Sequence, residues 1–177
     1  FEFDGSGIYV TRSGYTGEDG YEITVRNDAA QGLWRALLAH PDVLPIGLGA
    51  RDSLRLEAGL SLYGHELDET VSPVEAGLLW SIQKHRREAG GFPGAARIQR
   101  EIAQGAARRI AGIKPEGRAP ARDGTIIMAD GKEVGVITSG GFGPSAQGPV
   151  ALGFVPPDLA KAGQALELLV RGKALPA

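Results

Sequence analysis

Hydrophobic and polar positions alternate in two short stretches near the start of the chain. Residues 1–10 alternate on either side of Asp4-Gly5, a dipeptide typical of tight turns, and this pattern predicts a β-hairpin. A further strand is expected at residues 21–25. There Tyr21, Ile23 and Val25 share one face, and Glu22 lies on the opposite face.

The apolar spacing then becomes helical in three places. A helix capped by Asn27 or Asp28 is expected to end near His40-Pro41, a second spans Ala50–Ala58 before Gly59, and a third spans Ala95–Gln104 before Gly105. Between them, Ser72-Pro73-Val74-Glu75 has the pattern of a capping box at a helix start. Leu78, Trp80 and Ile82 alternate as in a strand, and the charged residues 84–88 indicate a solvated loop.

After residue 108 the chain is a series of short β-like runs, which predict strands at Arg109–Ile113, Thr125–Met128, Val134–Thr138, Val150–Val155 and Leu166–Val170. They are separated by the turn signals Asp123-Gly124, Asp130-Gly131, Gly140-Gly141 and Pro156-Pro157. The predicted fold class is α+β: a mixed strand–helix portion followed by a small all-β barrel or sandwich. We expect an α+β part at residues 1–90, a connecting helix at 91–105 and a β-barrel domain at 106–177.

Composition narrows the classes of partner. The chain has 177 residues, 42% of them hydrophobic, and a net charge of −2, so neither nucleic acid nor an anionic membrane is an expected partner. No apolar run approaches the roughly 20 residues of a membrane span. There is no cysteine, and the three histidines lack ligand spacing, so we expect no metal. Because residue 1 is Phe, we expect a longer parent polypeptide.

The segment that leads to Glu22 has three glycines and two acidic residues between two expected strands. One interpretation is a tight connection that needs the conformational freedom of glycine. The other is a ligand site in which Glu22, on the polar strand face, accepts two adjacent N–H donors with its carboxylate. A pterin ring presents such an edge.

Arg51 lies in the first turn of the helix that follows Gly47-Leu48-Gly49. Free backbone N–H groups at a helix start favour anions, and a guanidinium adds a fixed fork of donors. Arg51 is therefore either an anion-binding residue or one partner of a surface ion pair with an aspartate. Gly140–Ser145 lacks the ending of a phosphate-binding loop and is expected to be a hairpin connection.

Five segments, in order along nearly the whole chain, resemble the motifs of the glycine cleavage T-protein family of folate-dependent aminomethyltransferases. They are Thr11–Glu22, Ala50–Gly64, Ser72–Leu78 with Trp80, Gly117–Arg122 and Val136–Gly140. The resemblance implies transfer of the methylene of an aminomethyl group, carried on the lipoyl arm of the H-protein, to tetrahydrofolate. Ammonia is released, and no metal takes part.

The resemblance also implies roles for individual residues. Glu22 would accept hydrogen bonds from the pterin amide edge, Tyr15 and Trp80 would line the folate pocket, and Arg51 would bind a carboxylate or help to hold the folate site. The family's catalytic aspartate lies in its N-terminal half, outside this chain, so we expect the chain alone to be inactive. The expected location is the cytoplasm of a bacterium, or the mitochondrial matrix of a eukaryote.

Two alternatives stay open. The same folate-binding region occurs in sarcosine and dimethylglycine dehydrogenase-type proteins, where a flavin-binding segment precedes it. A non-catalytic folate-binding or carrier-docking fragment would show the same motifs without turnover. A related folate-binding protein of iron–sulfur assembly has a cysteine-containing motif, and the absence of cysteine argues against it.

Overall fold

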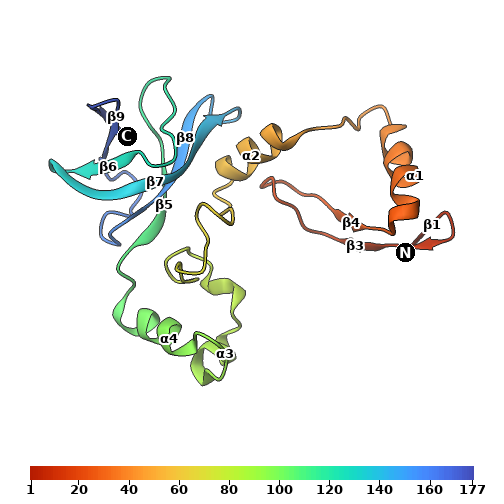
Figure 1. Cartoon of the computed structure of the whole chain (residues 1–177), viewed down its shortest axis with the longest axis horizontal. Coiled ribbons are helices and arrows are strands. Elements are labelled where there is room, and N and C mark those ends of the chain that lie inside the picture. The colour runs from red at the N-terminus through yellow and green to blue at the C-terminus, as the bar shows by residue number, and fades with distance from the viewer.

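The computed structural model describes all 177 residues and has an open, elongated arrangement (Figure 1). Two small β-ribbons and one helix lie at the N-terminal end, a sheet lies at the C-terminal end, and further helices lie between them in the sequence. The elements are β1 (Glu2–Phe3), β2 (Ser6–Gly7), β3 (Tyr9–Thr11), β4 (Glu22–Thr24), α1 (Asn27–Leu38), α2 (Leu48–Glu57), the 3-10 helix η1 (Leu79–Ser81), α3 (Lys84–Ala89), α4 (Ala95–Gln104), β5 (Arg109–Ile113), β6 (Ile126–Ala129), β7 (Lys132–Gly143), β8 (Gly148–Val155), β9 (Glu167–Val170) and β10 (Lys173–Pro176).

The N-terminal ribbons confirm the predicted alternation. β1 pairs with β2 around the turn at Asp4-Gly5, and β3 pairs with β4, with Thr11 opposite Glu22. No side chain before Arg55 is buried, so this part of the chain has no core of its own. The tip of the β3–β4 ribbon approaches the end of α2: a Cβ at Gly17, whose φ is +78°, would lie 2.5 Å from that of Ala58.

The N-terminal end of helix α1 differs from the prediction. Its N-cap is Arg26, and neither Asn27 nor Asp28 caps it with a side chain. Asp28 is instead in the first turn, where the helix dipole favours a negative charge, and it pairs with Arg26 at 3.0 Å. α2 begins two residues before the predicted Ala50, and Gly59, at φ +69°, follows its C-cap as predicted.

Three predictions for residues 72–89 are corrected. The capping box forms, because Ser72 N donates to Glu75 at 2.8 Å and Glu75 N donates to Ser72 at 3.1 Å, but only a turn follows it. The expected strand around Trp80 is η1, because the backbone bonds locally and no strand lies beside it. The expected charged loop is α3.

The last carbonyl groups of helix α3 accept hydrogen bonds from another helix, and these bonds stabilise the helical conformation of the charged residues. Gln99 of α4 donates to the carbonyl oxygens of Arg87 and Glu88 at 2.9 and 3.1 Å, and Gly90, at φ +70°, follows the helix. A contact from a residue twelve positions away leaves no signal in the local pattern. Helix α4 and its stop at Gly105 have the predicted bounds.

The C-terminal sheet has six antiparallel strands in the order β10-β9-β6-β7-β8-β5. The mixed α+β class is therefore confirmed, but β10 and β5 remain edges and the sheet is not a closed barrel. β10 itself was not predicted. The core of this sheet is formed by Ile113, Ala121, Ile127, Ile137, Ala151, Val155, Leu166 and Leu168.

Strand β7 is longer than its alternation suggested. Gly140 and Gly141 lie inside it, paired with Ala151 and Val150, and the turn to β8 comes after Gly143. Gly140 is a close-approach glycine, because a Cβ there would lie 1.7 Å from the carbonyl oxygen of Ala121. The predicted turn at Gly140-Gly141 is thus wrong, and Gly140 lets the segment before Arg122 pack against the strand. None of the helices is long and apolar enough to cross a membrane.

Candidate functional site

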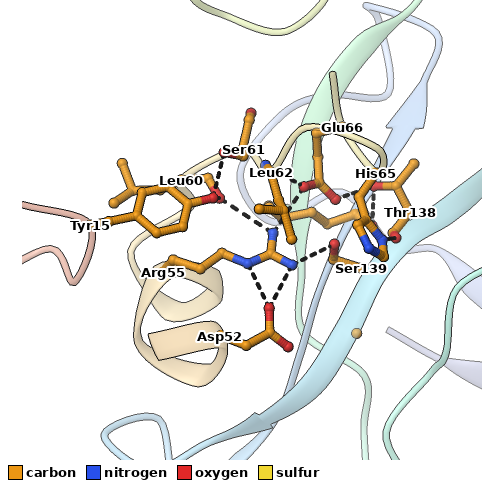
Figure 2. A network of polar contacts seen from close by, with 12 residues as sticks. Tyr15, Asp52, Arg55, Leu60, Ser61, Leu62, His65, Glu66, Thr138 and Ser139 are labelled. Carbon is orange, nitrogen blue, oxygen red and sulfur yellow. Dashed lines mark hydrogen bonds and ion pairs between the residues drawn. The ribbon is translucent and has the colours of Figure 1, made fainter. Parts of the chain in front are cut away.

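Helix α2 joins β7 through a buried arginine (Figure 2). The side chain of Arg55 is 2% exposed, and it donates to Glu66 at 2.9 Å and to the Ser139 hydroxyl of β7 at 2.8 Å. It also donates to Asp52, one helical turn earlier, at 2.9 Å. All three nitrogens of the guanidinium therefore have acceptors, which a buried charge requires.

Glu66 is the buried counter-ion and has no exposed surface. Thr138 donates to one of its oxygens at 2.6 Å, and the backbone N–H of Leu62 donates to the other at 2.9 Å. Burial alone raises the pKa of Glu66, but hydrogen bonds from the Ser139 and Thr138 hydroxyls and from Leu62, with the charge of Arg55, hold it below its usual range. Glu66 is therefore ionised at neutral pH.

A hollow of about 470 Å³ opens between α2 and β7, beside this network, and its volume is in the usual range for small-molecule sites. Its lining is mostly polar and charged. The lining residues are Tyr15, Leu48, Arg51, Asp52, Arg55, Leu62, His65, Arg122, Asp123, Thr138, Ser139 and Gly140.

Tyr15 and Arg51 form one wall of the hollow. The Arg51 guanidinium lies 4.7 Å from the centroid of the Tyr15 ring, and the Tyr15 hydroxyl donates to the carbonyl oxygen of Ser61 at 2.6 Å. Burial raises the pKa of Tyr15, partly offset by the charge of Arg55, so the hydroxyl keeps its proton at neutral pH. Asp52 pairs with Arg55, and Arg51 has no carboxylate within ion-pair distance. The surface-pair interpretation of Arg51 is therefore wrong.

The structure brings together two of the four predicted site residues. Glu22 is on the same ribbon as Tyr15 but is exposed; it accepts a hydrogen bond from Ser13 at 2.5 Å and does not line the hollow. Trp80 is 78% exposed, belongs to η1 and does not line it either.

Sequence reasoning missed most of the polar lining. The spacing of Arg55 one turn after Arg51 was a signal that the two could share a face, but not that Arg55 is buried. His65, whose Nδ1 lies 3.0 Å from the carbonyl oxygen of Thr138, and Arg122 come from loops and carry no periodic signal. No group of three or more His, Asp or Glu side chains is arranged to hold a metal ion.

Known proteins share the sequence and the overall fold of this chain. A family model described as the GCVT N-terminal domain matches residues 1–86, and one described as the glycine cleavage T-protein C-terminal barrel domain matches residues 108–177. The chain belongs to the glycine cleavage T-protein family.

Individual relatives agree with this assignment. The aminomethyltransferase of Nostoc sp. is 47% identical over 98% of this chain and 45% of its own length. The mitochondrial aminomethyltransferase of Pisum sativum is 44% identical over 97% of this chain and 43% of its own length. The crystal structure of the glycine cleavage system aminomethyltransferase T from Bartonella henselae is 43% identical, with a TM-score of 0.90 over 96% of this chain and 47% of that one. The chain thus spans less than half the length of these relatives.

Proposed function

We propose that this chain is the folate-binding C-terminal part of an aminomethyltransferase of glycine cleavage. The observation that carries the proposal is the Tyr15–Arg51 wall of the hollow, where two of the five motifs by which the chain resembles the family meet. An aromatic ring beside a guanidinium without a carboxylate partner suits a ligand that has both a flat ring system and a carboxylate. Tetrahydrofolate has both.

In this proposal tetrahydrofolate and the aminomethyl-loaded lipoyl arm of the H-protein are the two substrates. N5 and N10 of tetrahydrofolate each form a bond to the methylene carbon, while its bonds to the amino nitrogen and to the lipoyl sulfur break. The two protons lost by the folate nitrogens go to ammonia and to the dihydrolipoyl thiol, and the folate product is 5,10-methylenetetrahydrofolate. Tyr15 and Arg51 hold the folate, Glu22 accepts from the pterin amide edge, and Trp80 covers part of the ring system. The reaction belongs to the bacterial cytoplasm or the mitochondrial matrix.

Glu22 and Trp80 lie outside the hollow, so the proposal assigns the rest of the pocket to a further part of the polypeptide. A catalytic carboxylate is also assigned to that part, because a positioned acid or base contributes about 10²–10⁴-fold to a rate and needs a complete pocket around it. The 177-residue chain alone is therefore expected to bind folate weakly and not to turn over.

The test supplies tetrahydrofolate and aminomethyl-loaded H-protein to the complete polypeptide that contains this chain, and to the chain alone. Ammonia and 5,10-methylenetetrahydrofolate are measured together, with unloaded H-protein as the control. Equal amounts of both products from the complete polypeptide support the proposal. Oxidation of sarcosine or dimethylglycine by a bound flavin, or folate binding without ammonia release, would establish one of the two alternatives instead.

A further inference from the structure

Two hydroxyl groups lead to the carboxylate of Glu22 at the point where the β3–β4 ribbon opens into its loop. The Ser13 hydroxyl donates to Oε2 of Glu22 at 2.5 Å, and the Thr11 hydroxyl oxygen lies 3.1 Å from that of Ser13. Thr11 ends β3 and is paired with Glu22, the first residue of β4. The three side chains therefore form one connected chain of contacts across the mouth of the loop.

The direction of these hydrogen bonds follows from their last acceptor. An ionised carboxylate can only accept, and a serine hydroxyl has a single hydrogen to donate. Because the hydrogen of Ser13 goes to Glu22, Thr11 is the donor in its contact with Ser13. The order is thus Thr11 to Ser13 to Glu22, and each hydrogen bond in such a chain polarises the next.

The second carboxylate oxygen of Glu22, Oε1, is left for a ligand. Ser13 bonds only to Oε2, and Glu22 forms no ion pair. Arg12, the one basic residue of the loop, pairs instead with Asp19 at 2.8 Å and so does not compete for Glu22. Glu22 is otherwise exposed, and the bond from Ser13 is the contact that restricts its orientation.

We infer that Ser13 is a positioning residue, which holds the Glu22 carboxylate in place before folate binds. The inference rests on the proposed function, in which Glu22 accepts hydrogen bonds from the pterin amide edge. A glutamate that is free to rotate must be ordered when the ligand arrives, and this ordering reduces affinity. A hydroxyl that fixes the carboxylate beforehand removes part of that cost. Its loss is expected to weaken tetrahydrofolate binding by roughly threefold to tenfold.

The experiment measures the dissociation constant of tetrahydrofolate for the complete polypeptide that contains this chain, by titration calorimetry. Ser13→Ala should weaken binding by about threefold to tenfold. Ser13→Thr keeps a hydroxyl at this position and should bind as the unmodified protein does. In a Glu22→Ala background, Ser13→Ala should cause no further loss, because no carboxylate is left to position.

Two controls separate positioning from a general structural role. Ser6→Ala makes the same change on the β1–β2 ribbon and should leave the affinity unchanged. The unfolding midpoint of Ser13→Ala should equal that of the unmodified protein, because no side chain of the β3–β4 ribbon is buried.

Each contrary result has a distinct meaning. If Glu22→Ala weakens binding but Ser13→Ala does not, the inference is overturned and the proposed function stands. A loss in Ser13→Ala that persists in the Glu22→Ala background, or that comes with a lower unfolding midpoint, would also overturn it. Unchanged affinity in Glu22→Ala would remove both residues from the site. Failure of the unmodified polypeptide to bind tetrahydrofolate would overturn the proposed function itself.

Discussion

Replacing Glu66 by Gln tests whether the junction of α2 with the C-terminal sheet depends on its buried ion pair. The change keeps the shape of the side chain but removes the charge that faces Arg55 at 2.9 Å. Arg55 would retain Asp52, which is 62% exposed, the Ser139 hydroxyl and a 3.4 Å contact with the carbonyl oxygen of Leu60. The guanidinium would thus stay buried without a buried counter-ion.

Removing one partner of a buried pair costs about 3–5 kcal/mol of the free energy of unfolding, mostly because the other charge is left uncompensated. Gln can still accept one hydrogen bond with its amide oxygen, so the lower end, about 3 kcal/mol, is expected. For a protein of this size each kcal/mol shifts the melting temperature by about 2–4 °C, and the predicted shift is roughly 6–12 °C downwards.

The assay is urea unfolding of four proteins: the unmodified chain, Glu66→Gln, Arg55→Met and the double variant. If the ion pair between the two side chains causes most of the loss, the free energy of unfolding lost by the double variant should be about 1–3 kcal/mol smaller than the sum of the losses in the two single variants. A single Glu66→Gln loss below about 1 kcal/mol, or simple additivity of the two changes, would refute the reasoning.

Three further predictions concern the ligand and pH. Glu22→Gln should weaken tetrahydrofolate binding by the complete polypeptide at least about tenfold, because an acceptor becomes a donor facing a donor; unchanged affinity in calorimetry would remove Glu22 from the site. Arg51→Lys should also weaken it, and the loss should shrink for a folate analogue without the glutamyl tail, whereas an equal loss would assign Arg51 elsewhere. Because the pKa of Glu66 is lowered on folding, its contribution to stability is full above the usual carboxyl value of about 4.3 and is lost as pH falls through its lower folded pKa. Acid titration of the unfolding midpoint should therefore be shallower for Glu66→Gln.

The C-terminal sheet could be predicted well because its signals are local. β5 has the predicted bounds, Arg109–Ile113, and β8 and β9 differ by one or two residues, since their runs of apolar residues build the core directly. Predictions from the sequence were wrong where contacts with distant residues determine the local structure. Gly140-Gly141 had the composition of a turn, but the backbone of Ala121 occupies the space that a side chain there would need, and β7 continues through it.

Part of the site could be predicted for a similar reason. Tyr15 and Arg51 lie in motifs whose residue types indicate chemistry, and the structure places the two side chains against each other. Glu66 could not be found, because a lone glutamate in a loop resembles any surface glutamate until Thr138, 72 residues later, is known to donate to it. Long-range burial of this kind has no periodic signature in a single sequence.

The two arginines of α2 show why burial decides between structural and functional roles. Arg51 and Arg55 are one turn apart on the same helix and carry the same charge. Arg55 is enclosed, and Asp52, Glu66 and Ser139 occupy its donors, so its replacement changes the stability of the junction. Arg51 is exposed, its guanidinium lies over the ring of Tyr15, and it makes no side-chain hydrogen bond or ion pair, so its donors are available to an incoming carboxylate. Hence Arg51→Lys should weaken ligand binding with little effect on the unfolding midpoint, whereas Arg55→Met should lower the unfolding midpoint. If Arg51→Lys lowered the midpoint and Arg55→Met left it unchanged, the roles of the two side chains would be exchanged.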